Sequence, residues 1–347
     1  MIRFGPSGIP LSCKGRTLED GIKDVHKLGL NALEVQFLRT KVRTRPVEDE
    51  QIDLKAKEVP DKFVIGVNRG RDYEKVHVED LDKTLQAGDM IHSIRGGVAE
   101  EFHRYPYLAN LSKELDVKMS LHTPYYMKLT ADEGELVDKS KRSFHYGAVM
   151  ADALEANEVI THLGLIEEDM KHEDVIDSAV SNLRELRDWI YENCENEIKI
   201  GVETQTGEDV FGNLDEVLEV CRQVSGTKPV LNFAHIKAEG KYELDTEENF
   251  AEIFDMSRKF ISDYHYINFS GVEKRGQDKC RLTPIKRGDL QFEDLVDYLI
   301  KTDENINIIS TSPLKEHDAM YMKVIFERIY TREIGKRLRN KGNEAKA

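Results

Sequence analysis

Short apolar runs alternate with longer amphipathic stretches along most of the chain. Eight runs are typical of buried strands: Ile2–Phe4, Ala32–Phe37, Val117–His122, Val159–Leu163, Ile198–Glu203, Val230–Phe233, Tyr266–Phe269 and Ile306–Ile309. Seven segments between and after them repeat apolar residues at helical spacing: about Thr17–Lys27, Glu135–Glu155, Asp174–Glu192, Leu214–Val224, Glu247–Phe260, Phe292–Lys301 and Lys315–Arg337. This alternation predicts an α/β fold, a TIM (β/α)8 barrel, with an open doubly wound sheet as the alternative.

One region carries more chain than a single crossover helix requires. Between the second and third predicted strands, about 41–115 contains KFVIGVN and DMIHSIRGG, which are typical of extended segments that end near glycine turns. We therefore expect one barrel domain over 1–347 with an inserted segment at about 41–115. The polar, basic end at about 338–347 is expected to fray.

Composition limits the partners and the cellular location that the sequence predicts. No apolar run approaches the roughly 20 residues of a membrane helix, which predicts no membrane partner. The four cysteines form no CxxC pair, as expected for reduced thiols in a cytoplasmic protein. A net charge of −15 argues against non-specific nucleic-acid binding but leaves room for a local basic patch, such as the run of Arg and Lys residues at 39–45.

Polar groups gather where successive predicted strands end. The third strand ends at His122, the fourth at His162 and the fifth at Glu203, and Asn232 and His235 follow the sixth. In parallel barrels the reactive groups lie at these carboxyl ends of strands. One such histidine alone is more often a hydrogen-bonded loop residue. Two imidazoles with one carboxylate are a suitable ligand set for Zn²⁺ that leaves a position for water or substrate.

Several motifs in this order resemble the endonuclease IV family (AP endonuclease family 2) within the xylose-isomerase-like TIM barrels. They are RFGPSGIP, LEVQF, SLHTPYY, THLG, GVETQTG, NFAHIKAEG, INFSGVE and TSPLKEHDA. The resemblance spans nearly the whole chain except the insertion. It implies a zinc-dependent hydrolase of DNA repair that holds three zinc ions and cleaves DNA beside abasic sites.

The family's ligand positions are only partly kept. By resemblance, His122, His162 and Glu203 stand where the first zinc is held, and His235 stands at a ligand of the third zinc. The departures are Asn232 for an aspartate, Tyr266 for a histidine, Lys279 for an aspartate, Arg281 for a histidine and Thr311 for a glutamate.

These departures remove anions and add cations. We therefore expect a centre with one divalent metal, Zn²⁺ or alternatively Mn or Fe, held by His122, His162 and Glu203 with His235 as a further candidate ligand. The candidate substrate-binding residues are Asn232, Tyr266, Lys279 and Arg281. Lys279 or Arg281 could clamp a phosphate, or both could be solvated loop residues.

Three functions fit this sequence. The first is a metal-dependent phosphodiesterase that acts on abasic or damaged DNA or on a phosphorylated small molecule. The second is a non-catalytic barrel that binds nucleic acid or another ligand. The third is a sugar isomerase or epimerase, although of the acidic residues expected for that chemistry only Glu203 is kept. The catalytic residues themselves and the oligomeric state are not predicted.

Overall fold

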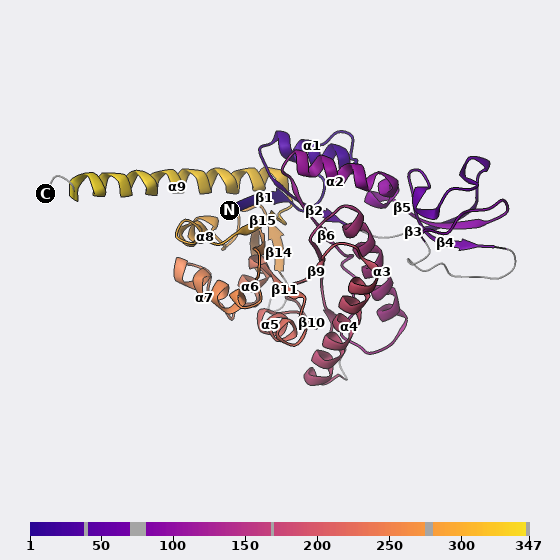
Figure 1. The fold of residues 1–347 in the computed structure, drawn as a ribbon. Helices are drawn as coiled ribbons and strands as arrows, with labels where there is room; N and C mark the ends of the chain where they lie inside the picture. The colour runs from indigo at the N-terminus through magenta and orange to yellow at the C-terminus, as the bar shows by residue number, and fades with distance from the viewer. Residues whose placement is uncertain (38–40, 70–80, 168–169, 275–279, 345–347) are drawn as a thin grey trace.

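Eight parallel strands form a barrel in the computed structural model, which describes residues 1–37, 41–69, 81–167, 170–274 and 280–344 (Figure 1). The strands are β1 (Ile2–Pro6), β2 (Ala32–Gln36), β6 (Lys118–His122), β7 (Glu158–Thr161), β9 (Lys199–Glu203), β11 (Thr227–Asn232), β12 (His265–Phe269) and β15 (Ile306–Ser310). Their order is β1-β15-β12-β11-β9-β7-β6-β2, and a parallel bridge between Ser7 and Glu34 joins its two ends. The predicted TIM barrel is confirmed.

The barrel closes between β1 and β2 at a glycine of β1. A Cβ on Gly5 of β1 would lie 1.8 Å from the carbonyl oxygen of Ala32 in β2. Only glycine allows this approach, so Gly5 helps the barrel to close.

A ring of helices covers the barrel: α1 (Leu18–Lys27), α2 (Tyr105–Glu114), α3 (Glu135–Ala153), α4 (His172–Asn193), α5 (Leu214–Gln223), α6 (Phe233–Glu239), α7 (Glu247–Arg258), α8 (Phe292–Leu299) and α9 (Glu316–Glu344). The sequence pattern did not predict α2 and α6. It also ended α9 near Arg337, whereas the helix continues to Glu344 and leaves the barrel (Figure 1). Residues 338–344, part of the segment that the sequence expects to fray, are thus helical.

The inserted segment builds a small sheet of its own. Strands β3 (Lys41–Pro46), β5 (Met90–Arg95) and β4 (Phe63–Asn68) pair antiparallel in that order, and the sheet stands beside the barrel (Figure 1). Val59, Val64 and Ile91 belong to a separate apolar cluster within it. Since α2 packs against α1, α3 and β6, it is a barrel helix. The inserted segment therefore ends before α2, and not at about 115 as the sequence analysis expects.

The 3₁₀ segments are Asp49–Gln51, Ala56–Glu58 and Gly97–Arg104. The short strand pairs are β8 (Gly164–Leu165) with β10 (Val210–Phe211), and β13 (Gly271–Lys274) with β14 (Cys280–Thr283). Among the described helices, none combines the length and the apolar character that crossing a bilayer would demand.

A buried ion pair lies toward the amino-terminal end of the barrel strands. Lys228 Nζ of β11 is 2.7 Å from Glu158 Oε2 of β7, and both side chains are almost wholly buried. The Tyr264 hydroxyl donates to the same carboxylate, and its ring lies 3.7 Å from the Lys228 ammonium. The Glu158 carboxylate therefore depends on this ammonium for compensation, whereas Lys228 also lies 3.6 Å from Asp263 Oδ1.

Replacing Lys228 by methionine should lower the free energy of unfolding by about 3–5 kcal/mol, because the Glu158 carboxylate would stay buried without its cation. Urea denaturation measures the change. Lys241→Met is the matched control, since it breaks an exposed pair with Asp215 and should cost less than about 1 kcal/mol. Equal effects of the two substitutions would contradict the proposed role of burial.

Candidate metal centre

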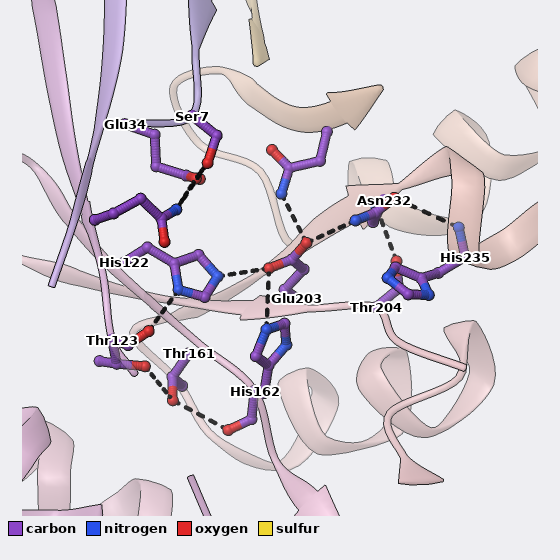
Figure 2. A network of polar contacts seen from close by, with 12 residues as sticks. Ser7, Glu34, His122, Thr123, Thr161, His162, Glu203, Thr204, Asn232 and His235 are labelled. Atoms are coloured by element: carbon purple, nitrogen blue, oxygen red, sulfur yellow. Dashed lines mark hydrogen bonds and ion pairs between the residues drawn. The ribbon is translucent and has the colours of Figure 1, made fainter. Parts of the chain in front are cut away.

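Three neighbouring strands bring two histidines and a glutamate together at their carboxyl ends (Figure 2). His122 is the last residue of β6, His162 follows β7, and Glu203 is the last residue of β9. One ligand atom from each of the three lies within 4.8 Å of the other two. Segments that are far apart in sequence thus meet at one point.

The two oxygens of Glu203 have different surroundings. Oε2 lies 2.6 Å from His122 Nε2 and 3.7 Å from His162 Nε2. Oε1 instead accepts hydrogen bonds from the side-chain amides of Asn232 and Asn268, each 2.8 Å long. One oxygen therefore faces the two imidazoles, and the other is fixed by neutral donors.

The histidine rings are presented in a form that suits a metal. His122 Nδ1 lies 2.7 Å from the Thr123 carbonyl oxygen, so Nδ1 carries the proton and donates it. This arrangement directs the lone pair of Nε2 toward Glu203 whenever that nitrogen is deprotonated. His162 Nδ1 is buried and has no hydrogen-bond partner within the described part of the chain, while Nε2 faces the cluster.

The two histidines differ in pKa. Burial alone would lower the pKa of His122, but the hydrogen bond and negative charge of Glu203 outweigh it and raise the pKa to about 9. Burial lowers the pKa of His162 to about 4. Burial would raise the pKa of Glu203, but the two histidines and Asn232 hold it well below its usual range. A divalent cation would replace the proton that His122 shares with Glu203.

The family model that describes a xylose isomerase-like TIM barrel matches residues 97–321, which is more than half of the chain. The chain belongs to this family. An uncharacterized protein of Methanocaldococcus jannaschii is 26% identical over 250 residues, which cover 69% of this chain and 90% of that protein.

Solved structures similar to this barrel include both sugar-directed and DNA-directed proteins. A D-tagatose 3-epimerase-like protein superimposes with a TM-score of 0.57 at 15% identity, covering 95% of this chain and 99% of its own. Endonuclease IV from Thermus thermophilus gives a TM-score of 0.55 at 17% identity, covering 94% of this chain and 99% of its own. At such identities the likeness establishes the fold alone.

His235 lies beside the centre of this xylose isomerase-like barrel but is not one of the three converging ligands. Its ring Nδ1 accepts from the Thr206 backbone N–H at 3.4 Å and lies 3.8 Å from Cys280 Sγ. Its backbone N–H donates to Asn232 Oδ1, so Asn232 caps α6 while its amide holds Glu203. Asn232 therefore orients the cluster rather than offering a free contact to substrate.

The remaining candidate substrate residues do not gather at the cluster. The Tyr266 hydroxyl is buried in the barrel, where it hydrogen-bonds Ser120 and donates to Glu34. Arg281 lies on β14 with an exposed side chain. Lys279 lies outside the described residues.

Two buried polar residues of the site were not singled out from the sequence. Asn268 is one donor to Glu203. Glu34 is a buried carboxyl that lies beside Ser7 (Figure 2), and Ser7 (2.7 Å), Gln36 (2.6 Å) and Tyr266 (3.0 Å) contact it. Burial raises the pKa of Glu34, although the charge of His122 opposes this. The available signal was a charged residue inside the apolar run LEVQF.

We expect the purified protein, loaded with Zn²⁺ and dialysed, to retain about one ion per chain, since one set of three ligands converges among the residues that the structure describes. His162→Ala should release the ion, whereas His235→Ala should not. Inductively coupled plasma mass spectrometry measures the content. About three ions per chain, or an unchanged content in His162→Ala, would contradict a single centre.

Metal affinity should rise with pH. With a pKa of about 9 in the metal-free protein, His122 is protonated at neutral pH, and the proton competes with the ion. The apparent affinity should therefore increase about tenfold per pH unit between pH 6 and 8. Competition with a chromophoric chelator, corrected for its own protonation, measures this slope. A flat profile would contradict a protonated His122 in the metal-free protein.

Proposed function

We propose that this barrel is a metal-dependent phosphodiesterase with a single divalent ion, Zn²⁺ in the simplest case. The observation that carries the proposal is the convergence of His122, His162 and Glu203 within 4.8 Å at the carboxyl end of the barrel. Two imidazoles and a carboxylate suit Zn²⁺ and leave a coordination position for water or a phosphate oxygen. The four described cysteines are free, in keeping with action in the cytoplasm.

The surroundings of Glu203 favour one ion over several. A carboxylate that bridges two ions must offer one oxygen to each. Here Oε1 already accepts two amide hydrogen bonds, from Asn232 and Asn268. Because amide N–H groups are donors and not ligands, this side of the carboxylate is closed to a second cation.

The chain supplies the remaining groups that hydrolysis needs. A bound divalent ion would activate a water molecule and offset charge on the phosphate. Water attacks phosphorus, one P–O ester bond breaks, and the leaving oxygen takes a proton. Glu34 is suited to donate that proton, because burial raises its pKa and keeps the carboxyl protonated to higher pH. Ser7 and Gln36 fix one oxygen of this carboxyl.

Glu34 also favours a second candidate, proton transfer on a sugar-like substrate. Isomerases and epimerases move a proton next to a carbonyl, which requires a titratable group in reach of the substrate. The sequence offered only Glu203 for this work, but the structure adds Glu34 in the same barrel interior.

We expect Zn²⁺-loaded protein to hydrolyse bis(p-nitrophenyl) phosphate, with release of p-nitrophenol followed by absorbance. Glu203→Gln should lower kcat/KM at least about a hundredfold, because it removes a ligand anion. Glu34→Gln should have a smaller effect with this substrate, whose leaving group needs little help from an acid. An abasic DNA duplex serves as a second substrate, which tests whether the enzyme acts on nucleic acid.

Three other outcomes would reject the proposal. Ketose interconversion that is lost in Glu34→Gln, without phosphodiester hydrolysis, would establish the second candidate. Ligand binding without turnover would indicate a non-catalytic barrel. Hydrolysis that persists in Glu203→Gln would place the reaction elsewhere.

A further inference from the structure

We propose that a pocket beside the metal centre binds the phosphate of a free, monosaccharide-sized phosphate ester. The inference concerns binding and goes beyond the proposed function, because a free monosaccharide phosphate is a monoester and not the diester that a phosphodiesterase cleaves. The binding itself stands on the pocket's own cations.

The pocket opens at the carboxyl ends of β1 and β2. It is a cavity of about 460 Å³, lined by the loop after β1, by Gln36, by the 3₁₀ turn at Gly97–Glu101 and by Lys315. Gln36 is paired in register with His122, and neighbouring strands lie about 4.8 Å apart. Gln36, one of the residues that line the pocket, therefore lies one strand away from a proposed metal ligand.

Two cations face this pocket without a carboxylate partner. In the described part of the chain, the Lys315 ammonium has a single hydrogen bond, to the Ile9 carbonyl oxygen at 3.4 Å. Arg16 is exposed and forms no ion pair with any described residue. Burial lowers the pKa of Lys315, and the positive charge of Arg16 lowers it further against the opposing charge of Glu316. Two neighbouring cations that repel each other are suited to an anion that contacts both.

Within the described part of the chain, the two carboxylates of the same pocket form no ion pair with Arg16 or Lys315. Glu101 accepts from the Leu18 backbone N–H at 3.2 Å, and Glu100 accepts from the Gly96 backbone N–H at 2.9 Å. They leave the cations free for a ligand. They also provide acceptors on another wall, which suit the hydroxyl groups of a sugar.

The cations are mounted on a fixed frame. Lys315 has φ +43, a left-handed conformation that costs energy in a residue with a side chain. The next residue, Glu316, accepts from the backbone N–H groups of Leu11 at 2.9 Å and Ser12 at 2.8 Å, which ties the loop after β1 to the start of α9. Both sides of the pocket are thus held together before a ligand arrives.

Pocket size and charge favour a small molecule over a nucleic acid. A volume of about 460 Å³ lies in the range of small-ligand pockets. The turn at Gly97–Glu101, which follows the inserted sheet, forms one wall of the cavity. The net charge of −15 disfavours a polyanion but not one phosphate.

The test is isothermal titration calorimetry of the full chain with ribose 5-phosphate, ribose and inorganic phosphate, with and without Zn²⁺. We expect ribose 5-phosphate to bind at least about tenfold more tightly than ribose. Lys315→Met and Arg16→Gln should each weaken it about tenfold or more, as the loss of a charge-assisted hydrogen bond implies. Lys14→Met is the matched control, because Lys14 is an exposed cation of the same loop that does not line the pocket. It should bind like the wild type.

Equal affinity for ribose and its phosphate, no binding of either, or wild-type affinity in both Lys315→Met and Arg16→Gln would overturn the pocket. Circular dichroism confirms that each variant is folded, and Arg16→Gln changes only an exposed side chain. Tighter binding of an abasic oligonucleotide than of ribose 5-phosphate would overturn the choice of a small ligand. Phosphate binding that survives in a protein without phosphodiesterase activity would reject the proposed function and keep the pocket.

Discussion

The carboxylate of Glu203 determines how the polar end of this barrel is arranged. A buried anion is costly unless charges or donors surround it, and here both do. His122 approaches one oxygen from β6, and amides from β11 and β12 hold the other. Three other strands thus contribute hydrogen bonds to one side chain of β9, and these bonds fix the direction in which each of the residues points.

The polar network around the buried Glu203 carboxylate continues on two sides of the cluster. The Asn232 amide that holds Glu203 belongs to the residue that caps α6, so the start of that helix is coupled to the centre. On the other side, Glu34 lies in a second set of hydrogen bonds with Ser7, Gln36 and Tyr266. The barrel interior thus contains an anionic centre beside a carboxyl with a raised pKa, two groups whose different environments suit different roles. The buried pair of Lys228 and Glu158 serves stability near the opposite end.

Additions to the barrel shape what reaches this centre. The insertion between β2 and α2 folds as a sheet with its own apolar cluster, and the turn that follows it forms a wall of the pocket above Gln36. Arg45 belongs to the basic run considered for nucleic-acid contact, but its side chain is buried against Glu48 and Gln51. The cations that face the pocket, Arg16 and Lys315, come from the loops after β1 and β15.

The sequence by itself determined the barrel and the positions of His122, His162 and Glu203, because apolar periodicity marks each strand and a polar residue at its end is visible locally. The sequence pattern did not predict α2, which lies in the stretch assigned to the insertion. It also did not predict α6, whose start depends on the side chain of Asn232. Only the tertiary structure decided that His235 and Tyr266 are not among the converging ligands, whereas Asn268 and Glu34 belong to the surroundings of the cluster. Strand register and side-chain direction bring these residues together from strands far apart in the chain, and no local pattern encodes those distances.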